Sequence, residues 1–79
     1  MKQPSIFADF QNPDPRGRLR LNCSGTIQDL ATQGIRLSEG LHLELYDEEL
    51  AVEGVAAYSR EEGIWVAVID SKAIRHHQP

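Results

Sequence analysis

Three runs of strand-type residues, separated by two short polar breaks, fill residues 40–70 and constrain the fold more than any other feature. The runs cover residues 41–46, 50–58 and 64–69. In the first run, Leu43 and Leu45 alternate with polar side chains, and side chains of a strand point alternately to opposite faces. The pattern therefore predicts a three-stranded antiparallel meander with one face committed to a core.

The length of the chain limits what this meander can belong to. Seventy-nine residues are enough for one domain, in which roughly 60 to 65% of the unfolded surface is buried. Such a domain has room for one core and a surface site but hardly for a deep enclosed pocket. We therefore do not expect an enzyme that engulfs its substrate.

Cysteine usage and hydropathy bear on the compartment. Cys23 is the single cysteine, so it has no internal disulfide partner, and the chain shows neither a charged-then-apolar leader nor an apolar run near 18 residues. These features predict a soluble cytoplasmic protein that does not enter a membrane.

The net charge of -4 is distributed unevenly along the chain. Residues 16–37 hold four arginines and one aspartate, whereas residues 39–63 hold eight carboxylates and one arginine. The chain is therefore electrically bipolar. Such a division can steer self-association or attract a charged partner, and it also fits solvated faces that keep the protein in solution.

Two short strands are expected before the meander. Ile6, Ala8 and Phe10 share one parity, which suits a short strand or an apolar arm. Residues 12–17 form a turn, in which Asn12 and Asp14 can accept bonds from nearby backbone amides. Residues 18–23 then alternate as a strand, with its apolar side chains facing inward.

Residues 26–33 are the one good helix candidate. Thr26 is expected to cap the first turn with Asp29 as its partner, and Gly34 is placed to end the helix in a left-handed conformation. Ile27, Leu30 and Ala31 then share the face that would lie against a sheet.

Five short strands and one helix predict a mainly β fold, a small and partly open barrel of order β-β-α-β-β-β. The domain is 1–79, with 1–16 as an N-terminal arm or strand plus a Pro-rich turn and 76–79 as a flexible tail. The last strand is apolar on both parities, so both of its faces need cover. The helix, the arm of residues 6–10 or a symmetry-related chain can supply the second cover.

Residues 40–75 resemble SH3-like barrels, because strand pairs with an acidic hairpin and an apolar Trp-bearing strand are followed by a short turn. That resemblance implies a module that binds peptides or nucleic acids. Taken whole, the chain also looks like a short bacterial protein, which implies no function.

A second resemblance rests on Gly17-Arg18-Leu19-Arg20-Leu21, a short helix through Asp29-Leu30, then Gly34-Ile35 and Glu39-Gly40-Leu41-His42-Leu43. These segments are similar to the swapped-hairpin barrels of bacterial transition-state regulators and antitoxins. The resemblance implies an interlocked dimer whose arginines on the first strand and helix contact DNA.

Residues that carry catalytic or metal chemistry are few. Cys23 is expected in the core, and His42 and the pair His76-His77 lack a third ligand at defined spacing. Glu44 and Glu53 are expected to face one another across the first hairpin, and Glu61-Glu62 to lie at the solvated tip of the second. We expect no catalytic residue, no metal site and no cofactor, and hence no enzyme.

Aromatic and basic side chains are better candidates for recognition. The expected interaction surface is made of Tyr46, Tyr58, Trp65 and His42, with Tyr46 the most exposed aromatic and Trp65 either plugging the core or facing a ligand. The expected stripe for phosphates or an acidic partner is made of Arg16, Arg18, Arg20 and Arg36.

The sequence therefore predicts a non-enzymatic protein-interaction or accessory module whose partner is another protein or a second copy of the chain. The alternative is a dimeric DNA-binding regulator of the swapped-hairpin type, disfavoured by the acidic net charge.

Overall fold

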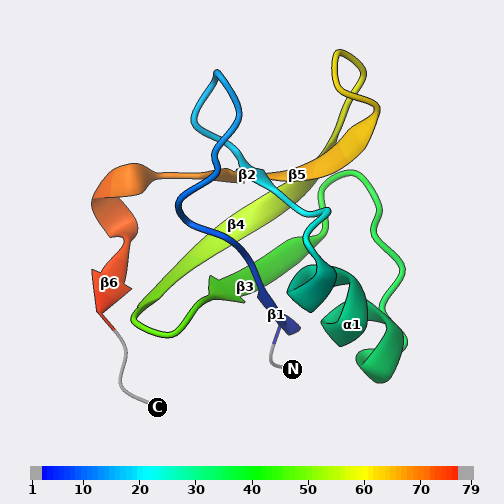
Figure 1. Ribbon diagram of the computed structural model, residues 1–79, viewed down its shortest axis with the longest axis horizontal. Coiled ribbons are helices and arrows are strands. Elements are labelled where there is room, and N and C mark those ends of the chain that lie inside the picture. Colours follow the sequence, from blue (N-terminus) through cyan, green and yellow to red (C-terminus); the bar gives the residue numbers. More distant parts are fainter. Residues whose placement is uncertain (1–2, 77–79) are drawn as a thin grey trace.

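The computed structural model describes residues 3–76, which form one curled sheet with a helix at its edge (Figure 1). The strands are β1 (Ser5–Phe7), β2 (Leu19–Arg20), β3 (His42–Tyr46), β4 (Leu50–Ser59), β5 (Ile64–Ile69) and β6 (Arg75–His76). Helix α1 (Ser24–Gln33) follows β2, and a 3-10 turn, η1 (Ser71–Ala73), precedes β6. The sheet order is β1-β3-β4-β5-β2, with β6 beside the start of β4. The predicted mainly β fold, a small and partly open barrel of order β-β-α-β-β-β, is confirmed, with β6 as an additional strand.

Strands β3, β4 and β5 form the predicted antiparallel meander. Glu44 lies opposite Glu53 across the first hairpin, as expected, and Tyr58 lies opposite Trp65 across the second. Leu43 and Leu45 point inward and are completely buried, so the period of two in the sequence marks the core face correctly.

The N-terminal arm completes one edge of this sheet. β1 pairs in parallel with β3, with Ile6 opposite Leu45, and both side chains are fully buried. Residues 5–7 of the arm therefore pair with the sheet of their own chain.

The core lies inside the curl. Its buried members come from β1 to β5 and the segments next to them: Ile6, Ala8, Leu19, Leu21, Leu43, Leu45, Val52, Ala56 and Ala67. Trp65, Leu30 and Ile69 pack against this cluster and remain partly exposed.

The outer face of β5 is covered over only part of its length. Val66 is fully buried, whereas Val68, two residues along on the same face, is 47% exposed. Val68 pairs with the half-buried Val55 of β4. The second cover that the doubly apolar strand requires is therefore present at Val66, whereas Val68 is left half exposed.

Helix α1 begins two residues earlier than predicted, and its expected cap is wrong. Cys23 occupies the N-cap position without a side-chain hydrogen bond to the helix amides. Thr26 and Asp29 lie within the helix and bond instead to the backbone of Phe7. The predicted end is confirmed: Gly34 adopts φ 65°, and its N–H donates to the carbonyl of Ala31.

The predicted apolar face of α1 is also wrong. Ile27 is 56% exposed and Ala31 is exposed, and only Leu30 of the three packs against the core. The helix instead turns polar side chains toward the free edge of β1.

Three such side chains, at positions i, i+3 and i+7 of the helix, satisfy the backbone of β1. Thr26 Oγ1 donates to the carbonyl of Phe7 at 2.6 Å, and Asp29 Oδ2 accepts from the N–H of Phe7 at 2.9 Å. Gln33 Nε2 donates to the carbonyl of Ser5 at 2.8 Å. An unpaired strand edge exposes donors and acceptors, so α1 does for β1 what a further strand would do.

Candidate interaction surfaces

Tyr58 and Trp65 form an aromatic pair at one end of the core face. Their rings meet edge to face, with centroids 5.3 Å apart and an interplanar angle of 77°. The pair follows the core pair Ala56 and Ala67 on the same face of β4 and β5. Trp65 packs against the core, whereas Tyr58 is 44% exposed. The core face thus continues into solvent as an aromatic surface.

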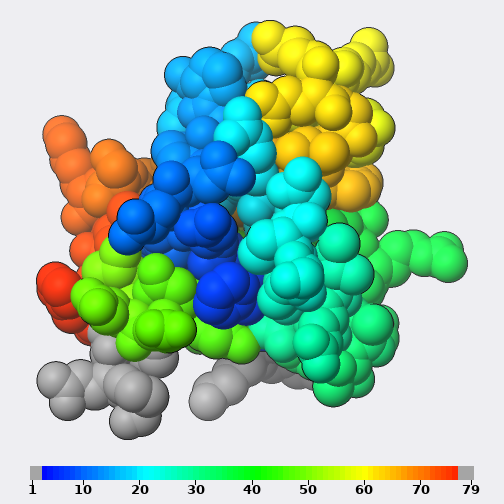
Figure 2. All heavy atoms as spheres, viewed as in Figure 1, coloured from blue at the N-terminus to red at the C-terminus, as the bar shows by residue number. Residues whose placement is uncertain are grey.

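Two neighbouring segments border this aromatic pair. The N–H of Leu21 donates to the carbonyl of Trp65 at 3.0 Å, and Glu39 Oε1 accepts from the N–H of Tyr58 at 3.0 Å. Figure 2 shows the β4–β5 hairpin (yellow) beside the segment that precedes α1 (cyan), on the face that also displays the helix. The backbone around the pair is therefore held from both sides.

Tyr46 is half-buried, which corrects the expectation that it is the most exposed aromatic. Its hydroxyl donates to Asp29 Oδ2 at 2.6 Å. Its ring meets the ring of Phe7 edge to face, with the two ring centroids 5.9 Å apart. The hydrogen bond to Asp29 is the main reason that the pKa of Tyr46 is raised above its ordinary value, with burial adding to it. Tyr46 therefore ties α1 to the sheet.

The predicted aromatic surface consequently divides in two. Tyr46 lies in β3 opposite Ala51, near the start of β4. Tyr58 follows Ala51 by seven residues in β4, roughly 23 Å away at the usual rise per residue. Because side chains alternate between the two faces of a strand, Tyr58 lies on the core face and Tyr46 on the outer face. His42 is exposed opposite Val55, on the outer face with Tyr46. Only Tyr58 and Trp65 of the four predicted residues contact each other.

The arginine stripe begins at a buried carboxylate. Asp14 is 5% exposed, and its Oδ1 accepts from the N–H groups of Arg16 at 3.0 Å and Arg18 at 2.8 Å. Its Oδ2 accepts from Arg18 Nε at 2.7 Å. Burial by itself raises the pKa of Asp14, but the hydrogen bonds from Arg18 and Arg16 outweigh it and hold the pKa below its usual value.

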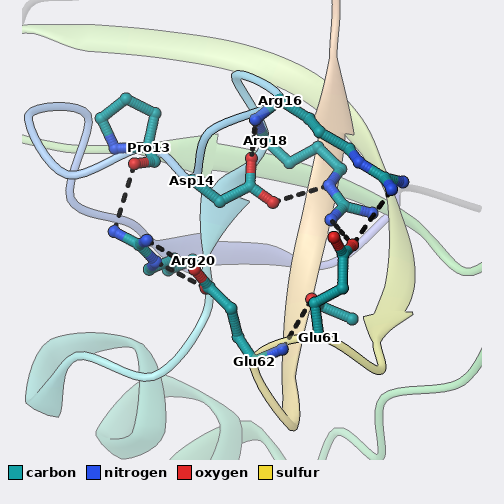
Figure 3. A network of polar contacts seen from close by, with 8 residues as sticks. Pro13, Asp14, Arg16, Arg18, Arg20, Glu61 and Glu62 are labelled. Carbon is teal, nitrogen blue, oxygen red and sulfur yellow. Dashed lines mark hydrogen bonds and ion pairs between the residues drawn. The ribbon is translucent and has the colours of Figure 1, made fainter.

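The β4–β5 hairpin tip supplies two further carboxylates to the stripe (Figure 3). Arg20 forms a two-pronged pair with Glu62, with Nε–Oε1 and Nη2–Oε2 distances of 2.8 and 2.7 Å. This pairing raises the pKa of Arg20 and lowers that of Glu62. Glu61 Oε1 lies 3.1 Å from Arg16 Nη2 and 4.0 Å from Arg18 Nη2.

Three of the four predicted arginines are thus brought together and paired within the chain. Arg36 lies apart from them, exposed in the segment that follows α1. The pairing was not predicted, because the two partners in the hairpin stand more than 40 positions from the arginines in sequence. A run of basic residues and an acidic hairpin tip were the available signals.

Residues considered for catalysis or metal binding are dispersed. Cys23 is half-buried, and its Sγ lies 3.0 Å from Thr26 Oγ1. His76 lies in β6, and its predicted companion His77 lies outside the described residues. Within residues 3–76, no three His, Cys, Asp or Glu side chains gather in a way that can hold a metal ion.

Carboxylates also line a hollow beside the turn after β3. The turn after β3 places Asp47, Glu48 and Glu49 beside Asp9 around a hollow of about 240 Å³. Across the sheet, Glu44 pairs with Arg75 and accepts from the hydroxyl of Ser5, and Glu53 accepts from Gln3. These carboxylates are exposed or partnered.

Comparison with known proteins adds no family. No family model, no curated protein and no solved structure matches the chain. Among the helices of the described part of the chain, none is long and apolar enough to cross a membrane.

Proposed function

We propose that this protein is a non-enzymatic interaction module that binds an apolar segment of a protein partner through Tyr58 and Trp65. The observation that carries the proposal is the edge-to-face aromatic pair at the open end of the core face, with Tyr58 44% exposed. Next to this end of the face, Ala56, Ala67 and Val52 are buried by the molecule's own side chains.

The aromatic pair has the properties of a recognition anchor. Tyrosine and tryptophan bury a large area with few rotatable bonds, and they are enriched among the residues that dominate binding energy. Trp65 is already packed against the core, so little side-chain entropy is lost when a partner covers it. A partner that completes the burial of Tyr58 extends the existing core.

The chemistry of the surroundings favours binding over catalysis. Paired carboxylates perform acid-base work where a low-dielectric cleft separates their pKa values. Glu44 and Glu53 instead hold separate partners on the outer face of the sheet, and Glu61 stands at an exposed hairpin tip.

The test begins with peptides selected for binding to the wild-type protein from a random library. Tyr58→Ala is expected to weaken the selected peptides at least tenfold, measured by calorimetry or fluorescence anisotropy, because it removes the exposed half of the anchor. The matched control is Val68→Ala, which truncates a residue of similar exposure on the outer face of the sheet, opposite to the face of Tyr58 and Trp65.

Binding should depend little on salt, because the contact is apolar. Equal losses in Tyr58→Ala and Val68→Ala, or none in either, would reject the proposed surface. Salt-sensitive binding of a DNA duplex that disappears in an Arg18→Ala, Arg20→Ala double variant would favour the DNA-binding alternative.

A further inference from the structure

A small hollow lies between the arginine turn and the β4–β5 hairpin. It has a volume of about 80 Å³ and is lined by Asp14, Pro15, Arg16, Arg18, Ser59, Glu61 and Glu62. Because one water takes about 30 Å³ in the liquid, the hollow admits a group the size of a few waters. The lining thus holds two guanidinium groups, one hydroxyl and three carboxylates. Two of these carboxylates, Asp14 and Glu62, are engaged by arginines of the chain.

The carboxylate of Glu61 is the anion that these guanidinium groups now hold. A single oxygen, Oε1, lies 3.1 Å from Arg16 and 4.0 Å from Arg18 (Figure 3). The Glu61 side chain is 65% exposed and comes from the turn of the hairpin. An ion pair this exposed contributes little to stability, so Glu61 can leave at small cost.

Arg18 and Arg20 are held more firmly than the Arg16–Glu61 pair. The Nε of Arg18 donates to the buried Asp14, and the Nη2 of Arg18 lies 4.0 Å from Glu61 Oε1. Arg20 is engaged by Glu62 in the two-pronged pair. Ser59 Oγ accepts from the N–H of Glu62 at 3.3 Å, and its hydroxyl proton is available for an acceptor in the hollow. Arg18 is therefore a fixed member of the site, whereas Arg16 is 65% exposed, like Glu61, and can follow the anion that it binds.

We propose that Arg16, Arg18 and Ser59 form a binding site for a single phosphate monoester, which Glu61 occupies in its absence. A phosphate monoester carries a charge of about -1.5 to -2 and three strong acceptor oxygens, so it outcompetes one carboxylate for two guanidinium groups. The small hollow and the acidic net charge of -4 favour an isolated phosphate over a nucleic-acid backbone. This inference does not rest on the proposed peptide surface, because no aromatic side chain lines the hollow.

The test measures inorganic phosphate binding by amide NMR titration at fixed ionic strength. Glu61→Gln removes the competing charge and is expected to tighten phosphate at least tenfold relative to wild type. Adding Arg16→Ala to that variant is expected to abolish the gain. Glu48→Gln is the matched control: it changes the net charge equally from the other acidic turn and is expected to bind phosphate like wild type.

Equal affinities in Glu61→Gln and Glu48→Gln would overturn the proposal, as would a gain that survives Arg16→Ala. Circular dichroism of each variant verifies the fold.

The source of the phosphate is distinguished by two further probes. Tighter binding of a phosphoserine peptide than of free phosphoserine supports the site and assigns it to a phosphorylated partner, whereas equal binding supports the site and assigns it to a small phosphorylated molecule. Tyr58→Ala is expected to leave phosphate binding unchanged, so the peptide surface and this site can fail separately.

Discussion

Asp14 illustrates how one side chain organises a turn that the sequence only outlines. The sequence correctly predicts that Asp14 accepts from nearby backbone amides, because aspartate favours this bond in turns. It does not reveal that the carboxylate is buried or that Arg18 Nε completes its bonding. Asn12, expected in the same role, accepts instead from Arg20 Nη1. Both arginines lie within eight positions of their acceptors, so the three-dimensional course of the turn decides these contacts, and the residue pattern does not contain that course.

Replacing Asp14 with asparagine is expected to cost about 1–3 kcal/mol of unfolding free energy near pH 7, because it removes the charged acceptor of a buried bond. The folded pKa of Asp14 lies below the ordinary aspartate value of about 3.9, so its stabilisation is complete above that pH and is lost as pH falls through the folded pKa. Urea unfolding between pH 2.5 and 7 tests this: the gap between wild type and Asp14→Asn should narrow with acid. A constant gap at all pH values would contradict the assigned role.

Tyr46 offers a second titration, at the alkaline end. With Tyr58→Phe in place, Tyr46 is the one remaining tyrosine of the two in the chain, and ultraviolet absorbance follows its phenolate. Its pKa is expected above the ordinary value of about 10, and Asp29→Asn should lower it. Because the folded pKa is raised, this bond stabilises the fold below pH 10 and is lost as pH rises through the folded pKa. An unchanged pKa in Asp29→Asn would show that burial alone causes the shift.

At the scale of elements, the strands of the meander were predictable, whereas the short extent of β2, the presence of β6 and the helix face were not. Alternation with a period of two placed Leu19, Leu43 and Leu45 inside, as the structure has them. The amphipathic argument for α1 failed because it assumes that a helix buries its apolar side chains. Here the helix lies along a strand edge whose backbone needs polar partners, and Thr26 and Asp29 supply them. The requirement of the β1 edge therefore outweighs the burial of Ile27.

Gly25 tests how closely α1 approaches β1. A Cβ atom at this position would lie 2.7 Å from Cδ1 of the Phe7 ring. Glycine to alanine in a helix ordinarily stabilises by about 0.5–1 kcal/mol, but Gly25→Ala is expected to destabilise by about 1–3 kcal/mol because the ring must move. Urea unfolding measures the change. Ser24→Ala, exposed in the same turn, is the control, and Phe7→Leu in the Gly25→Ala background should restore part of the loss. A stabilising Gly25→Ala would show that the helix does not approach β1 this closely.

At the scale of the whole molecule, the bipolar charge of the sequence is largely matched inside the fold. Each of the arginines Arg16, Arg18, Arg20 and Arg75 meets a carboxylate of its own chain. The sequence revealed the two charged regions but not their pairing, because the topology that brings residues 61–62 beside residues 16–20 depends on β2 joining β5. The acidic turn of residues 47–49 stays outside this pairing with the arginines.

We accordingly expect no charge-driven self-association. Light scattering after size exclusion should give the monomer mass of 8.9 kDa at both low and high salt. A dimer that dissociates with salt would show that the arginines and the acidic turn meet between copies. A dimer that persists in salt would place an apolar face, such as that of Val55 and Val68, in an interface.

The most direct test of the central claim is amide and indole NMR mapping of a selected peptide on the wild-type protein. The account predicts that the largest shifts fall on the indole N–H of Trp65, on Tyr58 and on the neighbouring Leu21 and Glu39. The outer-face residues Val55 and Val68 should hardly move. Shifts centred on the outer face or on the arginine turn, with the Trp65 indole unchanged, would contradict the claim that this aromatic pair is where the protein recognises its partner.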